Sequence, residues 1–175
     1  MTEKFQNKYR IASSRLKNWD YGWHAAYFVT ICTQNREYYF GDVLNGKMQL
    51  SEIGKIVDAE WLKTFKMRPD MNLKMGAYII MPNHFHAIII IGDNQYNANM
   101  DTTKNKFGTQ SKNLSSIIRG FKIGVCKNAR KIHADFAWQS RFHDHIIRSE
   151  ESYHRIEEYI LANPQNWVND EFNIY

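Results

Sequence analysis

One stretch near the middle of the chain decides the fold: Met81-Pro82-Asn83-His84-Phe85-His86-Ala87-Ile88-Ile89-Ile90-Ile91. A short apolar run that follows Pro-Asn predicts a turn entering a buried strand. Alternate side chains of a strand share a face, so His84 and His86 would point one way and Phe85 would point into the opposite layer. Two imidazoles on one face can chelate a divalent metal ion. The alternative is a pair of hydrogen-bonded or solvent-facing histidines that bind no metal.

A second His-x-His pair, His143 and His145, provides a contrast within the same chain. Its middle residue is Asp144, and a protein core does not accept an unpaired carboxylate. We therefore expect this pair on a half-exposed strand whose polar side faces solvent. A supporting role for these two histidines beside a metal site stays open. They are not part of the candidate site.

Length and composition are those of one globular domain. The 175 residues suit a single core, and 43% hydrophobic with 23% charged residues excludes a disordered chain. No signal-peptide pattern opens the chain, and its longest apolar run, Ala87–Ile91, is too short to span a bilayer. Cys32 and Cys126 fall inside a predicted strand and a predicted helix, which favours core residues in a reducing compartment. We expect a cytoplasmic protein with no membrane partner.

Positive charge is concentrated in one segment of the chain. The net charge is +5, and residues 102–134 contain no acidic residue. The basic residues of this segment are Lys104, Lys106, Lys112, Arg119, Lys122, Lys127, Arg130 and Lys131. Residues 150–175 are acidic by contrast. This asymmetry favours a polyanionic partner such as nucleic acid, which would make the protein nucleoid-associated; a solvated basic surface is the alternative.

Hydrophobic periodicity predicts a single α+β domain over residues 1–175. The predicted strands are His24–Thr33, Leu73–Met81, His84–Ile91 and Phe142–Arg148, with a small hairpin at Asn45-Gly46. The predicted helices run from Ser51 to Met67, from Lys112 to Lys131 and from Ser149 to Asn163. This order is typical of an antiparallel sheet with helices packed mainly on one face. Residues 1–20 would form a basic arm and residues 92–110 a mobile polar loop.

Three basic residues of the second predicted helix fall mostly outside its apolar stripe: Arg119, Lys122 and Arg130. These side chains are candidates for contacts to DNA phosphates. Such contacts position a nucleic acid without reading its sequence.

The last predicted helix carries Tyr159 and Asn163, which are four residues apart and therefore neighbours on one helix face. If Ile156 and Ile160 dock this helix on the sheet, Tyr159 and Asn163 could lie over the histidine face. The amide oxygen of Asn163 could then complete the metal site. The alternative is that Tyr159 is a core aromatic residue and Asn163 a C-terminal helix cap.

Several short motifs occur along the chain in a fixed order. They are Tyr27-Phe28-Val29-Thr30-Ile31-Cys32-Thr33, Arg36, Phe40-Gly41, Met81-Pro82-Asn83-His84-Phe85-His86, Trp138-Gln139, Asp144-His145-Ile146-Ile147-Arg148 and Tyr159-Ile160-Leu161-Ala162-Asn163-Pro164. In order and spacing they resemble the REP-associated tyrosine transposases, which belong to the wider family of single-tyrosine HUH transposases. The resemblance extends from about Arg15 to Asp170.

The resemblance implies a ferredoxin-like antiparallel sheet with the histidine pair on a central strand and the tyrosine on the C-terminal helix. It implies Mg²⁺ or Mn²⁺ bound by His84 and His86, with Asn163 as third ligand and Tyr159 as nucleophile. The implied activity is nicking and joining of single-stranded DNA at hairpin or repeat sequences in DNA transposition and recombination, through a 5′-phosphotyrosine. Members of the wider family exchange this helix within dimers and the REP-associated branch is monomeric, so either a monomer or a homodimer is compatible.

Two other functions remain alternatives. The first is a catalytically silent module that binds structured single-stranded DNA, and the second is an unrelated metal hydrolase. Binding alone requires neither the histidine pair nor Tyr159 and Asn163, so their joint presence favours an enzyme. Tyr153 lies six residues before Tyr159, which places it well apart around the helix axis, and we interpret it as a packing residue.

Overall fold

The computed structural model describes residue 16 and residues 19–98 and 111–174. In this part of the chain a four-stranded antiparallel sheet has the order β4-β5-β1-β6. Its strands are β1 (Ala25–Cys32), β4 (Leu73–Met81), β5 (His84–Ile91) and β6 (His143–Ile147). A separate hairpin is formed by β2 (Gly41–Leu44) and β3 (Lys47–Leu50).

Among the described residues, three α-helices cover this sheet: α1 (Glu52–Lys66), α2 (Leu114–Ala129) and α3 (Glu150–Ala162). Short 3-10 turns lie at η1 (Gln34–Arg36), η2 (Pro69–Met71) and η3 (Trp167–Asn169). Apart from the inserted hairpin, the order is strand, helix, two strands, helix, strand, helix, as the sequence predicts. The expected α+β class with an antiparallel sheet is therefore confirmed.

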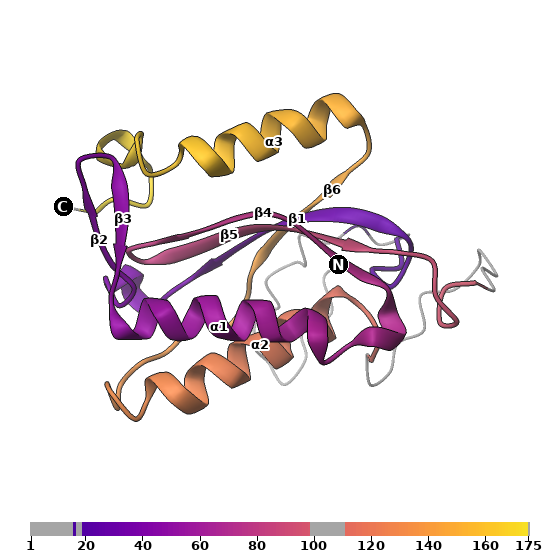
Figure 1. The fold of residues 1–175 in the computed structure, drawn as a ribbon, viewed down its shortest axis with the longest axis horizontal. Coiled ribbons are helices and arrows are strands. Elements are labelled where there is room, and N and C mark those ends of the chain that lie inside the picture. Colours follow the sequence, from indigo (N-terminus) through magenta and orange to yellow (C-terminus); the bar gives the residue numbers. More distant parts are fainter. Residues whose placement is uncertain (1–15, 17–18, 99–110, 175) are drawn as a thin grey trace, which may run out of the picture.

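The helices lie on both faces of the sheet (Figure 1). Helices α1 and α2 cover one face, and α3 alone covers the other. The expectation of helices mainly on one face therefore holds for two of the three helices, and α3 is the exception. Its apolar stripe requires a surface of its own, and the side of the sheet away from α1 and α2 provides it.

Strand β5 is central and separates two different layers. Phe85, Ala87 and Ile89 belong to the main core beneath α1 and α2. Ile88 belongs to a second apolar cluster with Ile160 of α3. The alternation places His84 and His86 on the α3 face, because cross-strand and alternate residues of a sheet share a face.

A glycine in β4 allows α3 to pack closely on the sheet. The pairing of β4 with β5 is irregular between Met75 and Tyr78, and Gly76 lies within that irregularity. A Cβ atom on Gly76 would lie 2.8 Å from both Ile88 Cβ and the hydroxyl oxygen of Tyr153. Because no side chain is present there, Tyr153 of α3 fits directly over the strand.

Each of the three helices begins directly after a residue whose side chain caps its N-terminus. Ser51 and Ser149 accept hydrogen bonds from the first turns of α1 and α3, as the sequence predicts. Helix α2 begins at Leu114, later than the predicted Lys112, because Asn113 forms a capping box with Ser116.

Much of the predicted basic arm (residues 1–20) and mobile loop (residues 92–110) lies outside the described residues. Within residues 92–98, the side chains of Asn94 and Asn97 hydrogen-bond to nearby backbone groups. In the described part of the chain, every helix is too short or too polar to cross a membrane.

Candidate active site

The two histidines of β5 lie under α3, and both are almost completely buried, with exposed fractions of 0% for His84 and 1% for His86. Their ring centroids are 4.5 Å apart. The strand therefore presents two adjacent imidazoles to one small volume between the sheet and α3.

His86 is held through both ring nitrogens. Its Nδ1 atom lies 2.8 Å from Oγ1 of Thr30 on the neighbouring strand β1, and its Nε2 atom lies 3.4 Å from the hydroxyl oxygen of Tyr159. Its ring also stacks on Phe28, with centroids 5.3 Å apart. These contacts fix the orientation of the imidazole, which is what a metal ligand or a catalytic group requires.

The neighbouring Asn83 determines which ring nitrogen of His84 carries hydrogen. The amide nitrogen of Asn83 donates to the backbone carbonyls of Arg36 and Phe172, which fixes the orientation of that amide. Its oxygen lies 2.9 Å from Nδ1 of His84, so Nδ1 is the nitrogen that carries hydrogen. The lone pair of His84 is consequently on Nε2, a buried atom with no hydrogen-bond partner among the described residues.

Asn163 completes this group of residues. It is the C-cap of α3 and is 1% exposed. Its side chain lies close enough to His84 and Tyr159 to influence the pKa of each. Yet neither of its side-chain polar atoms forms a hydrogen bond of good geometry within the described part of the chain.

Buried polar atoms without partners are rare in native proteins, and three of them occur here in two neighbouring side chains. An imidazole nitrogen and an amide oxygen are both common metal ligands. The described residues contain no group of three His, Cys, Asp or Glu side chains that could hold a metal ion. The side chains in this volume that could hold a divalent cation are His84, His86 and Asn163.

The electrostatics of the two imidazoles also suit metal binding. Burial lowers the pKa of His86 to about 3. Burial, followed by the neighbouring His86 and the charge of Arg36, lowers the pKa of His84 well below its usual value. Both rings are neutral at pH 7, which is the form that binds a metal ion.

Tyr159 reaches this volume from the last full turn of α3. It is 44% exposed, and its ring packs edge-on against Phe28 with centroids 6.2 Å apart. Burial of its hydroxyl raises the pKa of Tyr159, so the phenol keeps its proton at neutral pH. The tyrosine and the histidines belong to one chain, so neither helix movement nor a partner chain is required to bring them together.

Two residues of this volume are not among those predicted from the sequence. The ring of Phe172, in the C-terminal segment, lies against His84 with centroids 4.4 Å apart. The guanidinium carbon of Arg36 lies 4.1 Å from the centroid of the Phe172 ring. The Nη1 atom of Arg36 is buried and has no hydrogen-bond partner among the described residues.

The sequence contains a signal for Arg36 but none for Phe172. Arg36 belongs to the motifs that resemble the transposases, and both Asn35 and Arg36 have positive φ angles, 53° and 60°. Such backbone angles are uncommon outside glycine, and strained residues cluster at functional sites. Phe172 follows Pro164 in a segment without periodicity, so only the structure reveals its contact with His84.

The structure does not bring Arg119, Lys122 and Arg130 to the histidines. They belong to α2 or its C-terminal end, on the opposite face of the sheet (Figure 1). Lys122 donates to the carbonyl of Gln139 at 2.5 Å and Arg130 donates to that of Phe136 at 3.0 Å. Their role in DNA binding stays a prediction.

The second histidine pair lies on the edge strand β6, on the same face as His84 and His86. His143 pairs with Thr30, which also pairs with His86, and His145 pairs with Phe28. Both side chains are exposed, as the sequence predicts.

Comparisons with known proteins agree with this geometry at the level of the fold. No family model matches the chain. An uncharacterised protein of Haemophilus influenzae is 38% identical over 169 residues, covering 93% of this chain and 92% of that protein. Among solved structures, a REP-associated tyrosine transposase bound to a REP hairpin has a TM-score of 0.60 and 18% sequence identity to this chain. That match covers 90% of this chain and 74% of the transposase.

Proposed function

Because the chain belongs to the same protein family as the Haemophilus influenzae relative and shares its fold with a REP-associated tyrosine transposase, we propose that it is itself a tyrosine transposase. In this proposal a ferredoxin-like core carries a metal-dependent endonuclease and strand transferase for single-stranded hairpin or repeat DNA. The observation that supports it most directly is the 3.4 Å distance between the Tyr159 hydroxyl and Nε2 of His86, beside the unpartnered atoms of His84 and Asn163.

The residues that would hold a divalent cation, Mg²⁺ or Mn²⁺, are His84, His86 and Asn163. When bound, the cation supplies positive charge that polarises the scissile phosphate and stabilises charge developing in the transition state. Thr30 and Asn83 keep the two imidazoles in fixed orientations, so little reorganisation is needed when a ligand arrives.

Tyr159 is the nucleophile in this proposal. Its hydroxyl oxygen forms a bond to phosphorus and the bond from phosphorus to the 3′ oxygen breaks, while the proton that the phenol gives up balances the one that the leaving 3′ oxygen takes up. The products are a 5′-phosphotyrosine and a strand that ends in a 3′-OH. Attack by a second 3′-OH reverses these bond changes and joins two strands, so no external energy source is required.

Arg36 is a positioning residue for the phosphate in this proposal. Its guanidinium is the cationic group beside His84, and its buried Nη1 atom has hydrogen-bonding capacity that no described residue uses. Arginine matches the geometry of phosphate oxygens well, and a partly buried arginine binds them more strongly than an exposed one.

One observation favours the alternative of a binding module without catalysis. Phe172 covers His84, and Asn83 holds the backbone carbonyl of Phe172 at 2.7 Å. In this conformation the aromatic ring restricts access to the imidazole. The same fold would then bind hairpin DNA while the tyrosine stayed unused.

A covalent-trapping experiment separates these two functions. A labelled single-stranded hairpin oligonucleotide with a 3′-bridging-thio scissile bond is incubated with the protein and Mn²⁺, and adducts are resolved on a denaturing gel. We expect an adduct with the wild-type protein that disappears with EDTA and with Tyr159→Phe. Tyr153→Phe, on the same helix, is the matched control and should retain the adduct. Tight DNA binding without an adduct would support the binding module.

A further inference from the structure

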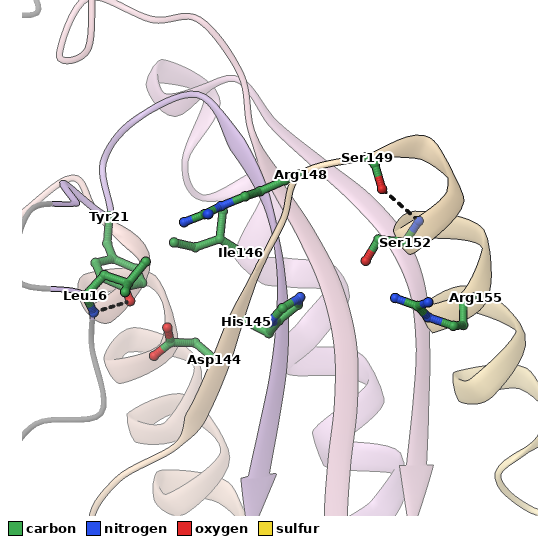
Figure 2. A pocket seen from close by; sticks show the side chains of 9 residues that line it. All are labelled: Leu16, Tyr21, Asp144, His145, Ile146, Arg148, Ser149, Ser152 and Arg155. Carbon is green, nitrogen blue, oxygen red and sulfur yellow. Dashed lines mark hydrogen bonds between the residues drawn. The ribbon is translucent and has the colours of Figure 1, made fainter.

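A pocket of about 550 Å³ lies beside the candidate active site, between the outer edge of β6 and the first turns of α3. Figure 2 shows its polar side chains on both sides of β6, with His145 and Arg155 on the side of α3 and Arg148 and Asp144 on the other side. We call it the β6 pocket and define it by His145 and Arg148 from the strand and its end, and by Ser149, Ser152 and Arg155 from the start of α3.

The β6 pocket is lined by side chains that favour anions. Arg148 and Arg155 are exposed, and neither makes an ion pair with a described residue. The guanidinium carbon of Arg148 lies 5.8 Å from the ring centroid of Trp19. Figure 2 shows Arg155 extending from α3 toward the strand that carries His145. Asp144 is the one acidic residue in the lining, and its side chain lies on the face of the strand opposite His145, the side to which Arg148 also extends in Figure 2.

The strand beneath this pocket is open along one edge. In the described part of the chain β6 pairs with β1 alone, so its outer backbone groups face the pocket rather than another strand. An extended ligand could therefore lie along β6 and hydrogen-bond to that edge. A nucleic-acid strand combines such an extended shape with the negative charge that the two arginines require.

The β6 pocket is also aligned with the proposed nucleophile. Arg155 precedes Tyr159 by four residues on α3, which corresponds to about 6 Å along the helix axis. On the sheet, His145 is two residues from His143, whose partner Thr30 contacts His86. A strand whose scissile phosphate lay at Tyr159 would pass this pocket with a neighbouring phosphate.

We propose that the β6 pocket binds the phosphate backbone of single-stranded DNA next to the scissile nucleotide, with Arg148 and Arg155 as the phosphate contacts. This inference rests on the proposed function, since it places the substrate strand relative to Tyr159. It assigns the substrate contact to the outer edge of β6, with Arg155 on the α3 side, whereas Arg119, Lys122 and Arg130 belong to α2 or its C-terminal end on the other face of the sheet.

DNA binding measured without catalysis tests this inference. In Tyr159→Phe protein with EDTA, fluorescence anisotropy gives the Kd of a labelled single-stranded hairpin oligonucleotide over a range of salt concentrations. Arg148→Gln and Arg155→Gln should each weaken binding about tenfold, the loss expected for one charged hydrogen bond. In the double variant the slope of log K against log salt should fall by about 1.4, the value for two lost phosphate contacts on a single strand.

Lys127→Gln is the matched control, because it removes one exposed positive charge from α2 on the opposite face. Equal losses in Lys127→Gln and in the two arginine variants would overturn the inference, as would a double variant that binds DNA like the wild type.

The proposed function is tested separately, by the covalent adduct. A covalent adduct at Tyr159 together with unchanged DNA binding in the double variant would overturn the β6 pocket alone. Weakened binding in the double variant without any adduct in the wild type would retain the pocket and overturn the transposase.

Discussion

The hydroxyl oxygen of Tyr159 lies 3.4 Å from Nε2 of His86, although 73 residues separate them in the sequence. Two independent elements produce this contact. Strand β5 fixes His86 through the hydrogen bond to Thr30, and α3 positions Tyr159 through the packing of Ile160 on Ile88. The contact therefore depends on how α3 lies on the sheet, and changes in that packing should change the chemistry.

Gly76→Ala should weaken this docking. The added Cβ atom would lie 2.8 Å from Ile88 Cβ and from the Tyr153 hydroxyl oxygen, closer than such atoms can approach. We expect a loss of about 1–3 kcal/mol in the free energy of unfolding, the usual cost of overpacking. We also expect a lower yield of covalent adduct, because α3 must shift away from β5. Urea denaturation and the trapping assay measure the two effects.

A second substitution distinguishes this mechanism from general damage. Tyr153→Phe removes the hydroxyl oxygen that Gly76→Ala would meet, so the double variant should regain part of both stability and adduct yield. If the double variant is no better than Gly76→Ala alone, the contact between Tyr153 and β4 does not set the position of α3.

Phe172→Ala should uncover His84. The Phe172 ring lies over the imidazole with centroids 4.4 Å apart, so it covers one face of His84 and narrows the approach to it. For each 1 kcal/mol by which this packing opposes ligand binding, the apparent affinity for the ligand falls about fivefold. We therefore expect tighter Mn²⁺ binding by calorimetry and faster adduct formation. Val168→Ala, 83% exposed in the same segment, is the control and should change neither quantity. Slower adduct formation in Phe172→Ala would instead show that the ring supports the site.

Arg36→Gln should reduce the maximal rate of adduct formation at saturating DNA. Its buried Nη1 atom has no partner among the described residues, and its charge acts on His84. A lost hydrogen bond to a charged group corresponds to roughly a ten- to hundredfold effect. Arg36→Lys should restore only part of the rate, because lysine keeps the charge but loses the planar pair of donors. Equal rates in both variants and the wild type would exclude a phosphate contact at this residue.

The sequence predicted the layers of this fold better than its long-range contacts. The alternation at His84, Phe85 and His86 indicated two faces, and the stripe of Ile156 and Ile160 indicated the docking of α3. These are local patterns that burial imposes on a strand and a helix. The contact of Phe172 with His84 depends instead on a hydrogen bond from Asn83 to the Phe172 carbonyl, 89 residues away. No periodicity in the C-terminal segment could indicate it.

The sequence also could not indicate where the basic side chains lie relative to the sheet. Charge and helical spacing placed Arg119 and Arg130 outside the apolar stripe of their helix, but they could not indicate which face of the sheet that helix covers. Arg148 and Arg155 fall in or beside an acidic stretch, so the charge pattern gave no reason to select them. Both line the pocket that forms where the end of β6 meets the start of α3.

The stability of the metal-free protein should fall in acid because of His86. Its pKa is about 3 in the folded protein and 6.5 in an unfolded chain, because burial penalises the charged ring. Between these values the unfolded chain binds a proton that the folded protein does not. The neutral His86 ring therefore makes its full contribution to the free energy of unfolding above pH 6.5. This contribution is lost as the pH falls toward 3, by up to about 1.4 kcal/mol per pH unit.

Urea denaturation in EDTA at a series of pH values between 7 and 4 measures this loss. Other groups that titrate in this range affect the wild type and its variants alike, so the informative quantity is the difference between them. His86→Gln should show a shallower fall in the free energy of unfolding than the wild type. His145→Gln replaces an exposed histidine of β6 and should follow the wild-type curve. Parallel curves for His86→Gln and the wild type would mean that His86 is protonated in the folded protein. A protonated ring could not serve as a metal ligand at those pH values.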